Sequence, residues 1–72
     1  MIGRVKWFNN TTGYGFIEYN SSQDIFIHYS NILQDGFKTL EADQLVEFQL
    51  LETSKGLQAL NIKVIKESTF EI

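Results

Sequence analysis

The stretch at residues 13–29, GYGFIEYNSSQDIFIHY, is rich in rings for its length. Side chains that follow one another in a β-strand point to opposite faces. The alternation on both sides of NSSQ therefore predicts two strands, at 14–19 and 24–28, paired as an antiparallel hairpin. One side of this hairpin is aromatic and carries Tyr14, Phe16, Phe26 and His28. The other side is aliphatic and carries Ile17, Ile25 and Ile27.

The rest of the chain continues the same period-2 pattern, and no segment of helical length carries an apolar stripe. We expect three further strands, at 3–9, 45–52 and 57–66, and one short helical turn at SNIL in the longer connection 29–43. Short strands at even spacing predict an all-β fold, a small five-stranded antiparallel β-barrel. The three isoleucines of the hairpin are expected to fill its interior. The side chains expected to join them are Val5, Ile32, Val46 and Ile62.

Length and composition limit what the protein can be. A chain of 72 residues buries only about 60% of the surface that it exposes when unfolded, so we expect one domain, at 1–66, and a short C-terminal tail, at 67–72. The absence of cysteine excludes a disulfide framework and thiolate metal sites, and it fits a reducing cytoplasm. No run approaches the ~20 apolar residues that span a bilayer, so no membrane partner is expected. The net charge of −3 weighs against a ligand held mainly through phosphates.

The aromatic side of the hairpin is expected to face solvent. Glu18 and His28 lie on that side, and both are costly to bury without partners. A contiguous exposed apolar patch on a small protein usually marks a binding site, and flat rings suit stacked nucleic-acid bases. The alternative is a sandwich in which these rings form the core and the isoleucines form a second buried face.

Four segments in the order and spacing found here resemble the bacterial cold-shock proteins. They are GRVKWFNNTTGYGFI, DIFIHYSNI, GFKTL and KGLQALNI, and the resemblance covers residues 3–64. It implies a β-barrel of the OB type that binds single-stranded RNA and DNA. It also implies a role as an RNA chaperone or a regulator of transcription and translation. We expect a cytoplasmic monomer without a cofactor or a small-molecule substrate.

The same resemblance assigns residues to the site. TGYGFI stands where the family has its first nucleic-acid-binding motif, and IFIHY stands where it has the second. The implied base-stacking residues are Trp7, Phe8, Tyr14, Phe16, Phe26, His28, Tyr29 and Phe37. The implied polar and backbone contacts are Lys6, Asn9, Asp24, Lys38 and Lys55. Alternation alone places Tyr29 on the aliphatic side, whereas the resemblance places it among the stacking rings.

The chain also departs from the family pattern. Thr12 stands where the family commonly has a lysine, Leu57 stands where it has a proline, and Tyr14 and Tyr29 replace phenylalanines. Losing the lysine weakens the attraction for phosphates. A tyrosine keeps the stacking surface of phenylalanine and adds a hydroxyl that can reach a base edge or a phosphate.

Other functions fit the residues less well. His28 and Asp24 lie roughly 13 Å apart along a strand, at about 3.3 Å per residue, which is too far for a catalytic dyad. Ser30 lies near His28 in sequence without a third partner or a glycine elbow, so no enzyme activity is expected. A single histidine offers no metal site, because zinc usually takes three or four protein ligands. A protein-interaction or oligosaccharide-binding module on the same scaffold stays open, because the charge is acidic and the lysine is missing.

Overall fold

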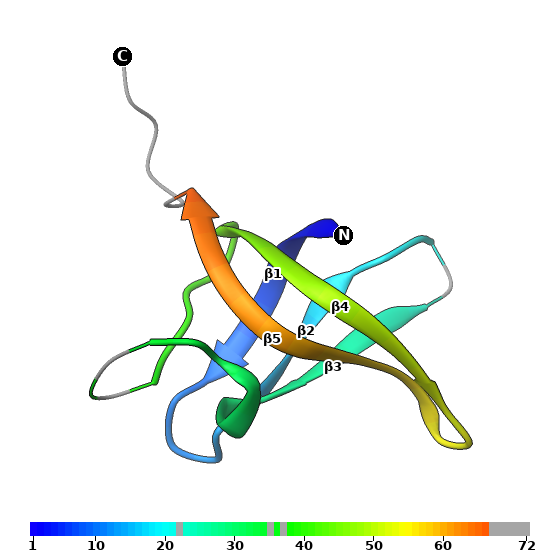
Figure 1. Ribbon diagram of the computed structural model, residues 1–72, viewed down its shortest axis with the longest axis horizontal. Helices are drawn as coiled ribbons and strands as arrows, with labels where there is room; N and C mark the ends of the chain where they lie inside the picture. Colours follow the sequence, from blue (N-terminus) through cyan, green and yellow to red (C-terminus); the bar gives the residue numbers. More distant parts are fainter. Residues whose placement is uncertain (22, 35, 37, 67–72) are drawn as a thin grey trace.

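The computed structural model describes residues 1–21, 23–34, 36 and 38–66. Its strands close into a barrel in the order β1-β2-β3-β5-β4 (Figure 1). They are β1 (Ile2–Asn9), β2 (Tyr14–Glu18), β3 (Asp24–His28), β4 (Leu45–Thr53) and β5 (Gly56–Lys66). The predicted strands and the all-β barrel are confirmed. The predicted tail at 67–72 lies outside the described residues.

One pairing of the barrel is parallel, which differs from the antiparallel barrel expected from the sequence. The strands β3 and β5 run in the same direction and pair through Ile25 with Leu57 and through Phe26 with Gln58. The pairings of β1 with β2, β1 with β4, β2 with β3 and β4 with β5 are antiparallel. A closed ring with an odd number of strands cannot alternate in direction all the way round, so one parallel pairing is unavoidable. Here it brings the start of β5 alongside β3.

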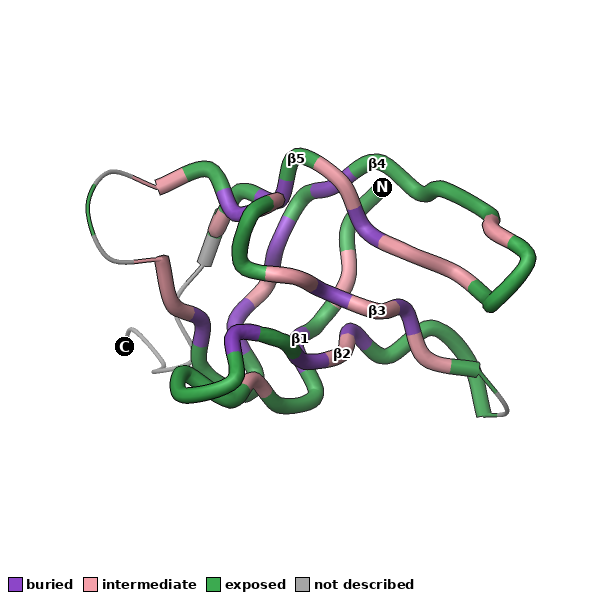
Figure 2. Tube along the Cα trace, turned by 90° about the horizontal axis from the view of Figure 1, so that it is seen from below, coloured by how far each residue is buried: buried purple, intermediate pink, exposed green. Residues whose placement is uncertain are grey.

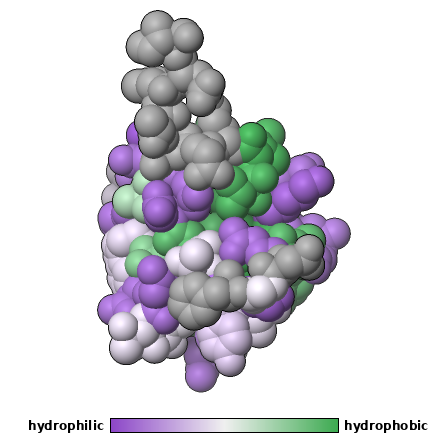
Figure 3. Space-filling view, turned by 90° about the vertical axis from the view of Figure 1, so that its left-hand side faces the viewer, coloured by the Kyte–Doolittle hydropathy of each residue, from purple (hydrophilic) through white to green (hydrophobic). Residues whose placement is uncertain are grey.

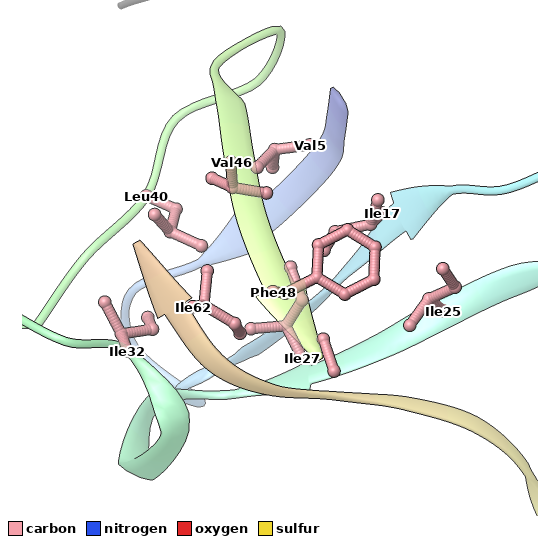
Figure 4. Close-up of a cluster of buried hydrophobic side chains, with 10 residues drawn as sticks. Val5, Ile17, Ile25, Ile27, Ile32, Leu40, Val46, Phe48 and Ile62 are labelled. Carbon is pink, nitrogen blue, oxygen red and sulfur yellow. The ribbon is translucent and has the colours of Figure 1, made fainter. Parts of the chain in front are cut away.

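Aliphatic side chains fill the barrel interior, while the turns between strands are largely exposed (Figure 2). Figure 4 shows these side chains converging from strands on different sides of the barrel. The predicted core residues Val5, Ile17, Ile25, Ile27, Ile32, Val46 and Ile62 are all fully buried. Leu40, Phe48 and Ala59 complete the cluster. Burying one such aliphatic side chain stabilises the fold by ~1.5–3 kcal/mol, and this closed interior excludes the sandwich alternative.

A β-bulge in β1 changes which of its side chains face outward. Val5 pairs with Ile17, but the next pair joins Trp7 to Phe16, so Lys6 is an extra residue on β1. One extra residue shifts the alternation of side chains by one position. Beyond the bulge, Trp7 therefore lies on the outer face beside Phe16, and Phe8 packs against the core.

The connection between β3 and β4 begins with the 3₁₀ helix η1 (Tyr29–Asn31), one residue earlier than the predicted turn at SNIL. Ile32 then forms an isolated parallel bridge with Ile62, and the backbone N–H of Leu33 donates to the carbonyl oxygen of Ile62 at 2.7 Å. These contacts hold the first part of the connection against β5. Within the part of the chain that the structure describes, no helix has the length and apolar character needed to cross a membrane.

Candidate functional site

Rings from β1, β2, β3 and η1 gather on the outside of the barrel. We call this surface the aromatic face, and it consists of Trp7, Tyr14, Phe16, Phe26, His28 and Tyr29. Trp7, Tyr14 and Tyr29 are 40%, 38% and 48% exposed, and the other three are half-buried. The rings therefore lie outside the core, as the alternation of the hairpin predicted for four of them.

Four rings of the aromatic face contact one another across the strands. The Trp7 ring centroid lies 5.9 Å from that of Tyr14 and 5.4 Å from that of Phe16. Phe26 continues the set, with its centroid 5.8 Å from Phe16 and 5.9 Å from Tyr14. These are distances at which aromatic pairs attract, so the rings support one another while part of each remains open to solvent.

The register of the β2–β3 hairpin fixes the order of residues along the aromatic face. Tyr14 lies opposite His28, Phe16 opposite Phe26, and Glu18 opposite Asp24. One end of the face therefore meets the β1–β2 turn, and the other end is bordered by carboxylates near the β2–β3 turn. These two turns lie at opposite ends of the barrel (Figure 1).

Trp7 reaches the aromatic face because of the bulge at Lys6. Without the extra residue, the alternation from Val5 would point Trp7 into the barrel and Phe8 outward. The structure instead places Phe8 half-buried against the core, away from the exposed rings. Alternation in the sequence carried no sign of this bulge, and only the family resemblance placed Trp7 at the site.

Tyr29 joins the face because β3 ends at His28 and the chain turns into η1. Its ring centroid lies 4.6 Å from that of His28. Gly13, at a φ of +83°, lies close against the same ring, and a Cβ atom there would come within 2.5 Å of Tyr29 Cδ2. The structure therefore places the Tyr29 ring beside His28, and simple alternation was wrong at this residue because the strand does not continue.

His28 also organises the start of η1. Its Nδ1 accepts a hydrogen bond from the backbone N–H of Ser30 at 3.3 Å and lies 2.8 Å from the Ser30 hydroxyl oxygen. Because a backbone N–H can only donate, Nδ1 acts as the acceptor in this bond. Ser30 thus holds the imidazole in place.

Gly15 is a close-approach position on β2. A Cβ atom there would lie 2.2 Å from the carbonyl oxygen of Trp7 and 2.7 Å from Cα of Phe8. No side chain fits, so glycine lets β1 and β2 pack closely where Trp7 and Tyr14 meet. The close approach of the β1 backbone therefore explains why position 15 is a glycine, as is common for a glycine within a strand.

Lys6 and Asp24 form an ion pair beside the aromatic face. The Lys6 ammonium lies 3.1 Å from Asp24 Oδ2, and the two side chains are 47% and 32% exposed. The bulge brings Lys6 from β1 to the first residue of β3 across the intervening strand. Both groups keep hydrogen-bonding capacity toward solvent, but the lysine charge already has a partner.

Two other predicted polar residues, Asn9 and Lys38, bond to the protein's own backbone. Asn9 Oδ1 accepts from the backbone N–H groups of Thr11 and Thr12 at 2.8 and 3.0 Å, so this side chain shapes the β1–β2 turn. Lys38 donates to the carbonyl oxygens of Ile32 and Gln34 at 3.0 and 3.5 Å. Phe37 lies outside the described residues.

Lys55 lies beside the aromatic face in a groove that the sequence did not predict. The groove runs between Phe16 and Phe26 on one side and Lys55, Leu57 and Gln58 on the other. Lys55 is exposed and has no ion pair among the residues that the structure describes. Leu57 and Gln58 come next to β3 only through the parallel pairing, which has no local signal in the sequence.

The comparisons with known proteins agree with this geometry. The family model of the 'Cold-shock' DNA-binding domain matches residues 1–65. The chain belongs to the cold-shock domain family. Cold shock-like protein CspB of Bacillus cereus is 52% identical over 62 residues, which cover 86% of this chain and 95% of that protein. The cold shock-like protein of Thermotoga maritima is 48% identical over 66 residues, which cover 92% of this chain and all of that protein.

A solved structure, Drosophila Unr CSD456, has the same fold at a TM-score of 0.71 with 21% identity. The alignment covers 97% of this chain but 28% of that one, so the likeness concerns the fold alone. The family model that matches the chain describes a DNA-binding domain, and the aromatic face is the surface that fits a nucleic-acid ligand.

Proposed function

We propose that this cold-shock domain binds single-stranded RNA and DNA by stacking unpaired bases on the aromatic face. The observation that carries the proposal is the continuous set of ring contacts from Trp7 to Phe26, on a surface where the rings stay partly open. Stacking one base on an aromatic side chain is worth ~1–3 kcal/mol by alanine substitution. Such stacking needs no excess of positive charge, so an acidic protein can bind in this way.

A single strand fits this surface better than a duplex. Bases in a duplex are stacked on each other and expose only their edges in the grooves, whereas the aromatic face offers flat apolar rings with few free cations. Binding unpaired bases favours open RNA over folded RNA in proportion to the difference in affinity. The domain thereby acts as an RNA chaperone that needs no ATP.

Fluorescence of Trp7 tests the binding mode directly, because it is the only tryptophan and lies on the aromatic face. An oligothymidine of about seven nucleotides, a length suited to one OB fold, is expected to quench it. A duplex of matched composition and a neutral oligosaccharide are the control ligands. Binding to the duplex as tightly as to the single strand, or binding to the oligosaccharide alone, contradicts the proposal.

Chaperone activity needs a separate test on a folded substrate. An RNA hairpin with a fluorophore and a quencher at its ends is expected to open on addition of the protein without ATP. Phe16→Ala should reduce opening, because Phe16 contacts both Trp7 and Phe26. Ile65→Ala is the control, since Ile65 is 44% exposed near the end of β5, far along the strand from the residues that pair with β3. Equal loss of opening in both variants would argue against a role for the rings.

A further inference from the structure

A second groove continues from the Tyr29 end of the aromatic face. The β1–β2 turn contributes Asn10, Thr11 and Thr12 to it, and the connection to β4 contributes Tyr29 and Lys38. The Thr39 hydroxyl donates a hydrogen bond to Asn10 Oδ1 and so ties the connection to the turn. Figure 3 views the molecule from this end, and pale atoms of intermediate hydropathy cover its lower part. Because Tyr29 belongs to both surfaces, a nucleotide stacked on its ring places its sugar and phosphate near this groove.

The groups that could hold a phosphate in this groove already have partners inside the protein. The Lys38 ammonium is bound to the carbonyl oxygens of Ile32 and Gln34. The backbone N–H groups of Thr11 and Thr12 donate to Asn9 Oδ1. The next N–H of the turn, that of Gly13, donates to the carbonyl oxygen of Asn9 at 2.8 Å. A phosphate needs a cation or a set of free N–H groups, and the Lys38 ammonium and these three N–H groups are already bound.

Neutral hydroxyl groups in the same groove remain uncommitted. The side-chain hydroxyls of Thr11, Thr12 and Tyr29 make no hydrogen bond to any residue that the structure describes. A hydroxyl can both donate and accept. The sugar group of matching chemistry is the ribose 2′-hydroxyl, which also donates and accepts and which distinguishes RNA from DNA.

We propose that this groove binds the ribose of the nucleotide stacked on Tyr29, and that its hydroxyls make the domain prefer RNA to DNA of the same bases. The inference rests on the proposed function, because it requires a base on the aromatic face. It goes further by naming the preferred nucleic acid and the groups that recognise it. Thr12 and Tyr29 are specificity-determining residues here, at positions where the family pattern has lysine and phenylalanine.

The experiment compares an oligouridine of about seven nucleotides with its 2′-deoxy counterpart, followed by Trp7 fluorescence. The two ligands share bases and phosphates, so their affinity ratio isolates the 2′-hydroxyl. A net hydrogen bond corresponds to a factor of about 2 to 12 in affinity, and the wild-type protein is expected to favour RNA by such a factor. Tyr29→Phe and Thr12→Val each remove a hydroxyl and keep most of the side-chain shape, so each should lower this ratio toward one.

Tyr19→Phe is the matched control, because Tyr19 is 42% exposed near the β2–β3 turn, at the other end of the barrel. It should leave the RNA-to-DNA ratio at the wild-type value. Equal affinity of the wild-type protein for both oligonucleotides, or a ratio that survives in both groove variants, overturns this inference while leaving single-strand binding intact. A ratio that falls as far in Tyr19→Phe also overturns it. If neither oligonucleotide binds, the proposed function fails as well.

Discussion

Substituting Lys55 by glutamine should nearly abolish the salt dependence of single-strand binding. Three lysines were predicted near the ligand, but Lys6 is paired with Asp24 and Lys38 is bound to backbone carbonyls. Lys55 is exposed in the groove beside Phe16. We therefore expect one phosphate contact in the wild-type protein, from Lys55.

The expected size follows from counterion release. Each phosphate contact with a single strand contributes about −0.7 to the slope of log affinity against log salt concentration. One contact predicts about a 3-fold loss of affinity between 50 and 200 mM salt, whereas three contacts predict about a 20-fold loss. In Lys55→Gln the slope should fall toward zero. Titration of Trp7 fluorescence with an oligothymidine at several KCl concentrations separates these cases.

Lys38→Gln is the control for this measurement, because it removes the same charge from a lysine that serves the fold. Losing the hydrogen bonds to Ile32 and Gln34 should lower the free energy of unfolding by about 1 kcal/mol, measured by urea denaturation, with little effect on the salt slope. A wild-type slope near −2 would refute the reasoning, since Lys6 and Lys38 would then have to leave their partners for phosphates. A slope in Lys55→Gln as steep as in the wild type would refute it equally.

Three further outcomes follow from the site and the core. Phe26→Ala should weaken binding of an oligothymidine by ~1–3 kcal/mol. Ile27→Ala, at a fully buried position, should instead lower the free energy of unfolding by ~2–5 kcal/mol. Equal destabilisation of both variants in urea would show that the Phe26 ring serves the core. Gly15→Ala should lower the melting temperature measured by circular dichroism, because the new Cβ would lie 2.2 Å from the Trp7 carbonyl oxygen, and an unchanged melting temperature would contradict this close approach. Thr12→Lys should steepen the salt slope by about 0.7 if the β1–β2 turn meets the strand's phosphates, and an unchanged slope in the same titration would place that turn away from them.

Local alternation was sufficient to predict the strands and most of the core, although Leu40, Phe48 and Ala59 were missed. The two faces of a strand meet different surroundings. The sequence pattern alone therefore assigned Ile17, Ile25 and Ile27 to the interior and the rings of Tyr14, Phe16 and Phe26 to the outside, as the structure shows. The turn at NSSQ marked where the two strands of the hairpin end, because its residues favour turn conformations. These signals lie within a few residues of one another, which is why they can be read without the fold.

The tertiary structure decided on which side of the barrel three aromatic side chains lie, those of Trp7, Phe8 and Tyr29. The bulge at Lys6 moves Trp7 outward and Phe8 inward, and the end of β3 at His28 frees Tyr29 from the alternation. Both features arise where strands must bend or end to close the barrel. The alternation of polar and apolar residues near these positions does not indicate where the strand bends or ends.

The sequence by itself determined an all-β barrel with an aliphatic interior and an aromatic outer side, because side-chain alternation is a local property of the chain. Only the tertiary structure decided the parallel pairing of β3 with β5, which brings Lys55 and Leu57 beside Phe16 and Phe26. It also decided that the ammonium groups of Lys6 and Lys38 are bound within the protein. The Lys55 ammonium has no such partner among the residues that the structure describes. The physical reason is that the β3–β5 pairing and the Lys6–Asp24 ion pair join residues far apart in the chain, which only the closed barrel brings together. The Lys38 contacts join residues close in sequence, and they depend on the path that the connection after η1 takes.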